Sequence, residues 1–240
     1  MKLACTSGAC SQLLESGELT QLEFLDSFGR ACACDSVVLD VRHFPRTDAD
    51  YLAQVKKMAA DRGITIAALA DDGFFSAQAA SMDARIEQAL GLGAPLLLTR
   101  AAPETAMTWS GQLERINHAT GIAKRANVTL ALRNAPGTFA ASAPDCKRVS
   151  KEADSAWLRF ALDPAAFDPA SDLEFVESKS VALCAPLYLE EQLVNEFLER
   201  YGIFCGPLVL EGSGDGSYEH MQSATRRWRI ALARFELDRT

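Results

Sequence analysis

Short apolar segments alternate with amphipathic stretches along the whole of the 240-residue chain. The apolar segments have the length of strands, and the stretches between them carry apolar residues at helical spacing. Successive segments start roughly 20 to 35 residues apart, which is the length of a βα unit. The predicted strands are Leu3–Cys5, Val37–Val41, Ile64–Leu69, Pro95–Thr99, Val128–Leu132, Leu158–Leu162, Val181–Cys184 and Leu208–Leu210.

Local signals mark where the intervening helices begin. Thr20 and Glu23 form a capping-box pair at the start of one predicted helix. Asp168 is a capping residue followed by Pro169, and this pair predicts another helix that begins there. No linker, charge block or change in composition divides the chain.

Eight βα units predict a single-domain (β/α)8 TIM barrel that covers residues 1–240. A doubly wound open sheet has the same local pattern and is the alternative. The alternation inside the strands favours the barrel. Ala131 and Arg133 share one face of the fifth strand, as Ala161 and Asp163 do in the sixth, and the large apolar residues take the other face. Small residues followed by a polar one at the carboxyl end are typical of a barrel interior, whereas an open sheet needs bulky apolar residues on both faces.

Composition excludes several classes of protein. The net charge of −8 and the pI near 5.0 argue against a protein that binds the phosphate backbone of nucleic acids. No apolar run approaches the roughly 18 residues of a membrane span. Seven scattered cysteines without a secretion signal indicate reduced thiols. We therefore expect a cytoplasmic protein that acts on a small molecule, with a homodimer left open.

Five short segments together resemble the xylose isomerase-like TIM barrels, a family that includes sugar and sugar-phosphate isomerases and epimerases of carbohydrate metabolism. Each motif is short, so the resemblance depends on their order and spacing along nearly the whole chain. The segments are Leu3–Thr6, Ser36–Phe44, Leu130–Asn134, Leu162–Pro164 and Leu210–Tyr218.

The resemblance implies a divalent metal at the barrel mouth. In the family its ligands are a glutamate ending strand five, an aspartate ending strand six, a histidine on strand seven and a glutamate ending strand eight. This sequence keeps Asp163 and Glu211, has Arg133 in place of the first glutamate, and has Ala182 as the best match for the histidine.

Arg133 changes the expected chemistry of that site. Its guanidinium stays protonated at any ordinary pH. The electrostatic repulsion between this charge and a divalent ion some 5 Å away is on the order of 5 kcal/mol at an effective dielectric near 20. We therefore predict no cofactor and no tight metal site, with at most weak divalent binding at Asp163 and Glu211. Arg133 either forms a purely stabilising ion-paired triad with these acids or anchors an anionic or polyhydroxy ligand.

Further candidates follow the ends of the predicted strands. His43 is interpreted either as a hydrogen-bonded loop residue or as a proton-transfer group. Asp71, Arg100 and Asn134 are candidate substrate contacts by position alone. The glycine-rich loop Gly212–Ser217 is either a helix cap or a phosphate site, and it does not match the nucleotide-binding fingerprints.

Two functions remain in competition. One is a sugar isomerase or epimerase in which Asp163, Glu211 and His43 are catalytic and Arg133, Asn134, Arg100 and Asp71 bind substrate. The other is a non-catalytic relative that binds a metabolite or a partner. Metal-dependent DNA repair nucleases are known relatives with the same fold. This function is disfavoured, because the sequence has only three histidines for a metal cluster and a negative net charge that opposes DNA binding.

Overall fold

The computed structural model describes residues 1–76, 78–212 and 218–239. Eight parallel strands follow one another around a closed barrel, and β8 returns to pair with β1. This closure confirms the (β/α)8 prediction and rules out the open sheet. The strands are β1 (Lys2–Thr6), β2 (Ser36–Asp40), β3 (Thr65–Asp71), β4 (Leu96–Arg100), β5 (Thr129–Arg133), β6 (Leu158–Leu162), β7 (Ser180–Pro186) and β8 (Pro207–Glu211).

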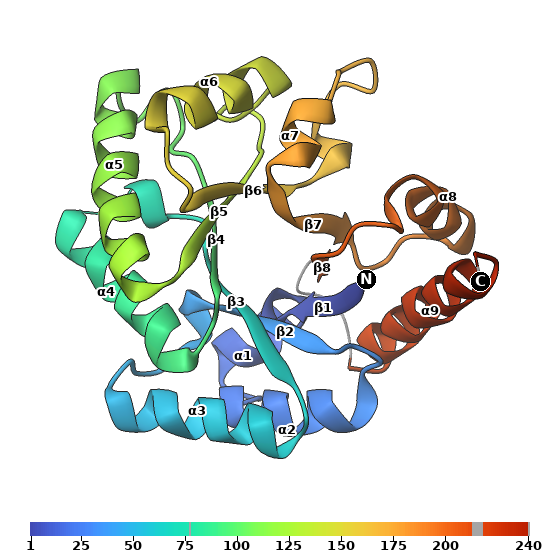
Figure 1. Cartoon of the computed structure of the whole chain (residues 1–240). Coiled ribbons are helices and arrows are strands. Elements are labelled where there is room, and N and C mark those ends of the chain that lie inside the picture. The colour runs from blue at the N-terminus through green and yellow to red at the C-terminus, as the bar shows by residue number, and fades with distance from the viewer. Residues whose placement is uncertain (77, 213–217, 240) are drawn as a thin grey trace.

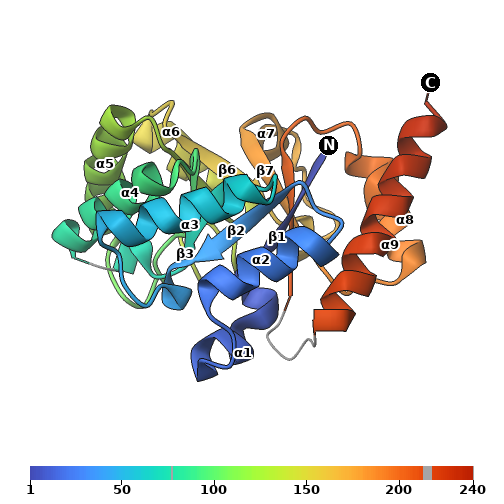
Figure 2. The same ribbon diagram turned by 90° about the horizontal axis from the view of Figure 1, so that it is seen from below.

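Helices α2 to α9 surround the barrel in the order of the chain, as the ring of their labels in Figure 1 shows. Figure 2 shows α1 at one end of the barrel and both chain termini at the other. The helices are α1 (Ser11–Ser16), α2 (Gln21–Ala31), α3 (Ala49–Asp61), α4 (Ala79–Leu92), α5 (Trp109–Ala126), α6 (Ala143–Ala153), α7 (Glu174–Ser178), α8 (Glu191–Tyr201) and α9 (Tyr218–Leu237). Among the described helices, none is both long and apolar enough to cross a membrane.

The barrel interior is filled mainly by small side chains. Large apolar residues such as Leu130 and Phe160 face outward and join the core beneath the helices. This division confirms the alternation expected from the sequence, and it keeps the interior narrow. The interior residues, all nearly or completely buried, are Ala4, Val38, Ala68, Leu98, Ala131, Ala161, Ala182, Cys184 and Val209.

The capping signals have mixed outcomes. The capping box at Thr20 and Glu23 is present, with Thr20 accepting a bond from the Glu23 backbone and Glu23 accepting one from that of Thr20. The prediction that a helix begins at Asp168-Pro169 is wrong. The Asp168 carboxylate accepts a hydrogen bond from the Ala170 N–H in a turn, and the next helix, α7, begins only at Glu174. An aspartate followed by proline also initiates turns, and here the turn forms.

A larger side chain in the small-residue layer is expected to destabilise the barrel. Ala161→Leu should lower the free energy of unfolding by about 1–3 kcal/mol, because the closed interior has no room for the added carbons. Urea denaturation measures the change, with Ala60→Leu on the exposed face of α3 as the control. Equal effects of the two substitutions would contradict the close packing of the interior.

Candidate functional site

One cavity of about 510 Å³ opens at the carboxyl ends of the strands. A single rule positions much of its lining: in each strand, the residue two positions beyond an interior residue reaches the cavity, since side chains alternate with a period of two. The position after Ala131 is Arg133, and the position after Ala161 is Asp163. The eight residues placed in this way are Thr6, Asp40, Ala70, Arg100, Arg133, Asp163, Pro186 and Glu211.

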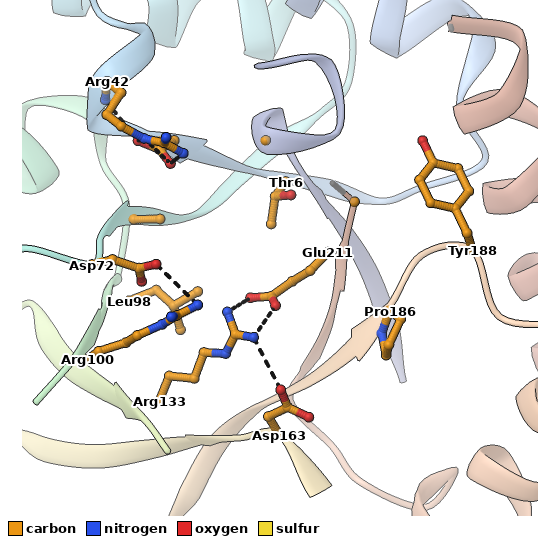
Figure 3. Close-up of a pocket in the computed structure, with 14 residues that line it drawn as sticks. Thr6, Arg42, Asp72, Leu98, Arg100, Arg133, Asp163, Pro186, Tyr188 and Glu211 are labelled. Carbon is orange, nitrogen blue, oxygen red and sulfur yellow. Dashed lines mark hydrogen bonds and ion pairs between the residues drawn. The ribbon is translucent and has the colours of Figure 1, made fainter. Parts of the chain in front are cut away.

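Arg133 lies between two carboxylates in this cavity (Figure 3). Its Nη1 donates to Glu211 Oε1 at 2.6 Å, and its Nη2 lies 2.6 Å from Glu211 Oε2. The same Nη2 donates to Asp163 Oδ2 at 3.2 Å. The guanidinium therefore holds Glu211 through both of its oxygens and Asp163 through one, which is the strong geometry for an arginine–carboxylate pair. The triad predicted from the sequence is present.

Burial strengthens this cluster electrostatically. The side chains of Arg133, Asp163 and Glu211 are only 16%, 14% and 22% exposed. Burial raises the pKa of Glu211 to about 7, against the lowering effect of Arg133. Burial acts to lower the pKa of Arg133, but Glu211 and other negative neighbours outweigh it, so the pKa of Arg133 is raised and its charge is permanent.

Asn134 holds the end of β6 in place beside the cluster. Its Nδ2 donates to the Asp163 carbonyl oxygen at 2.9 Å, and its Oδ1 accepts from the Asp163 backbone N–H at 2.8 Å. Asn134 is almost completely buried and is not among the residues that line the cavity. Its position supports a structural role that fixes the backbone from which the Asp163 carboxylate extends.

Two more ion pairs line the cavity. Arg100 lies 3.2 Å from Asp72, as Figure 3 shows, so Arg100 reaches the cavity as the sequence predicted. At the rim, Arg42 Nη2 donates to Asp40 at 2.8 Å, and Arg42 also lies 3.5 Å from Glu15. Each of these guanidinium groups is therefore compensated by a neighbouring carboxylate.

His43 and Asp71 lie outside the cavity lining. The His43 ring is buried, and its Nδ1 contacts Ser7 Oγ at 2.8 Å. Ser7 Oγ also accepts from the Asp40 backbone N–H at 3.0 Å, so Ser7 links the His43 ring to the end of β2. Asp71 pairs with Arg85 of α4 at 3.2 Å, and burial raises its pKa against the effect of this partner.

Sequence reasoning missed several cavity residues. Thr6, Asp40 and Asp72 follow the alternation of their strands and were identifiable by counting two positions from Ala4, Val38 and Ala70. Tyr188 extends from the segment after β7 and had no such signal (Figure 3). In the loop predicted as a cap or phosphate site, Gly212 lines the cavity, and 213–217 lie outside the described residues.

The residues present do not fit the divalent metal that the resemblance implies. The point on which Asp163 and Glu211 converge is taken by Nη2 of Arg133. Ala182, the sequence match for the ligand histidine, is an apolar residue that pairs with Ala161, two residues below Asp163, and Cys184 lies closer to the level of Asp163. Among the described residues, no group of three histidine, cysteine, aspartate or glutamate side chains is arranged to hold a metal ion.

Comparison with known proteins identifies the family. The sequence profile described as "Xylose isomerase-like TIM barrel" matches residues 28–183. No match was found among curated protein sequences.

Several solved structures share the fold at low sequence identity. D-psicose 3-epimerase from Clostridium cellulolyticum H10, solved with D-tagatose, superposes with a TM-score of 0.75 at 14% identity, covering 99% of both chains. The probable 3-DHS dehydratase of Bacillus anthracis gives 0.71 at 14% identity, covering 94% of this chain and 98% of that one. The 3-keto-D-glucoside 4-epimerase of E. coli gives 0.69 at 14% identity, covering 99% of both.

The buried His43 ring should make stability depend on pH. Burial lowers the pKa of His43 below its ordinary value of 6.5, with Arg42 acting in the same direction and Asp40 and Glu15 opposing it. The unfolded chain therefore takes up this proton first, and stability is lost as pH falls below about 6.5. Urea unfolding at several pH values should show a smaller loss for His43→Gln than for the natural protein. Equal pH slopes would contradict the neutral, buried ring.

Removing the Asn134 side chain should destabilise the end of β6. Asn134→Ala leaves the Asp163 backbone N–H and carbonyl without their partner, at a cost of about 2–4 kcal/mol in the free energy of unfolding. Urea denaturation measures it, and Asn117→Ala on α5 is the matched control. A loss no larger than that of the control would show that the two bonds do not hold Asp163.

Proposed function

This chain belongs to the xylose isomerase-like TIM barrel family, and on that premise we propose that it transfers a proton between neighbouring carbons of a small polyhydroxy carbonyl compound, a sugar or sugar phosphate. The observation that carries the proposal is the guanidinium of Arg133 held beside Glu211 and Asp163 in the mouth cavity. Such a transfer needs a base next to the C–H bond and a positive group next to the carbonyl oxygen.

Glu211 is assigned as the base. The carbon next to the substrate carbonyl loses its proton to the Glu211 carboxylate, and the electron pair of the broken C–H bond moves to the carbonyl oxygen. The charge that develops on this oxygen is stabilised by the N–H groups of Arg133. In isomerisation Glu211 returns the proton to the former carbonyl carbon, while the proton of the neighbouring hydroxyl moves to the original carbonyl oxygen and the new carbonyl forms at the deprotonated carbon. In epimerisation a water molecule protonates the opposite face of the deprotonated carbon as the original carbonyl re-forms, and the hydroxide left behind takes the proton from Glu211.

The other residues of the cavity bind and orient the substrate in this proposal. Asp163 holds Nη2 of Arg133 together with Glu211 and accepts hydrogen bonds from substrate hydroxyl groups. The Arg100–Asp72 pair offers a donor and an acceptor to further hydroxyls. His43 faces Ser7 instead of the cavity, so it supports the backbone at Asp40 and takes no part in the proton transfer.

A non-catalytic binding protein is the second candidate. It is favoured by one observation: Arg42, Arg100 and Arg133 each already contact a carboxylate, so the described cations of the cavity are compensated before a ligand arrives. Such a cavity binds hydroxyl groups without the free charge that drives a reaction.

Deuterium exchange separates the two candidates. Ketoses such as D-psicose, D-tagatose and D-fructose, and their phosphates, are incubated with the protein in D2O and followed by proton NMR. We expect deuterium at the carbon next to the carbonyl, at a rate that falls by about 10² to 10⁴ in Glu211→Gln, because a general base contributes that much. Glu199→Gln, on the exposed face of α8, is the matched control and should exchange at the normal rate.

The opposite result is equally informative. If calorimetry detects saturable binding of one of these compounds while no deuterium enters any of them, the protein is the non-catalytic relative. Exchange that survives unchanged in Glu211→Gln would remove Glu211 from the proposed role.

A further inference from the structure

The carboxylates of Asp163 and Glu211 converge on a single atom. Asp163 Oδ2 lies 3.2 Å and Glu211 Oε2 lies 2.6 Å from Nη2 of Arg133. The two acids extend from β6 and β8, which are not neighbours in the barrel, and Figure 3 shows Arg133 reaching between them. Two carboxylates that approach one point from different sides are arranged as the ligands of a cation.

We propose that the guanidinium of Arg133 is a resident cation that occupies this position and keeps divalent metal ions out of it. The inference concerns cation binding, so it goes beyond the proposed reaction and holds whichever reaction the cavity performs.

The competition favours the guanidinium for two reasons. It is attached to β5, so it meets the two acids without any loss of translational freedom, whereas an ion must be taken from solution. It also donates hydrogen bonds to Glu211 Oε1 and Asp163 Oδ2 and forms a close ion pair with Glu211 Oε2. An entering ion would therefore have to displace Arg133 or stand against its charge.

The rest of the site gives an entering ion little help. Hard divalent ions need several oxygen ligands. The nearest residue of β7 at the level of Asp163 is Cys184, whose small side chain offers no oxygen. Asp40 and Asp72 are engaged by their own arginines elsewhere in the cavity. Among the described residues no third histidine, cysteine, aspartate or glutamate completes a metal-binding group with Asp163 and Glu211.

The inference predicts that replacing Arg133 strengthens metal binding at this position. Mn²⁺ is titrated into the natural protein, Arg133→Glu and Arg133→Met, and binding is followed by calorimetry and by the electron paramagnetic resonance signal of free Mn²⁺. Arg133→Glu should bind Mn²⁺ at least about a hundredfold more tightly than the natural protein, because a repulsive charge is replaced by a third carboxylate. Arg133→Met, which only removes the charge, should fall between the two.

Controls separate the site from a general change in charge. Arg125→Glu makes the same charge change on the exposed surface of α5 and should leave Mn²⁺ binding as it is in the natural protein. Adding Glu211→Gln to Arg133→Glu should weaken the new binding by at least about tenfold, because one of its oxygens becomes an uncharged amide. Thermal unfolding establishes that each variant is folded, and Arg133→Met carries the test if Arg133→Glu does not fold.

Two outcomes would overturn the inference. One is micromolar Mn²⁺ binding by the natural protein that is lost in both Asp163→Asn and Glu211→Gln. The other is binding by the folded Arg133 variants that is no tighter than that of the natural protein. Both outcomes are read from binding alone, so they do not depend on whether the proton transfer occurs.

Discussion

The contact of Arg133 with Glu211 and Asp163 is the interaction on which the site depends. Closure of the barrel brings two acids from β6 and β8 into one partly buried cavity, where their mutual repulsion is poorly screened. A permanent positive charge between them makes this arrangement stable. Breaking such a cluster by removing one partner costs more than the cluster contributes as a whole, because it leaves a buried charge uncompensated.

The barrel delivers these three side chains through one simple constraint. Side chains alternate along each strand, and the inward positions are small until the strand reaches the mouth. In six of the eight strands the next inward position then carries a polar group, as in Ala131 followed by Arg133 and Ala161 followed by Asp163. The narrow interior thus stabilises the fold and at the same time fixes the spacing of the chemistry above it.

The same alternation explains which predictions from the sequence succeeded. The barrel, the face of each strand in the parity analysis and the triad at Arg133 follow from periodicity, which is a local property. Asp71 and Asn134 were chosen only because they stand near strand ends, and both lie one position out of phase with the inward series, so their side chains contact Arg85 and the Asp163 backbone instead. Counting in steps of two selects Asp72 in place of Asp71.

Other features depend on contacts that periodicity does not encode. The register between β6 and β7 shifts between Phe160 and Ala161, so the levels of β7 residues relative to Asp163 do not follow from the alternation alone. His43 ends the short 3-10 helix Val41–His43 after β2, and its ring contacts Ser7, which follows β1. A contact between two different loops leaves no repeating pattern in the sequence. Tyr188 reaches the cavity from a connecting segment, where no repeating pattern applies.

Crystallography with anomalous scattering tests the central claim most directly. Crystals of the natural protein grown in millimolar Mn²⁺ are measured at the manganese absorption edge. The account predicts continuous density for the Arg133 guanidinium between Asp163 and Glu211 and no anomalous peak there. A manganese peak at ligand distance from both carboxylates, with Arg133 turned away from them, would contradict it.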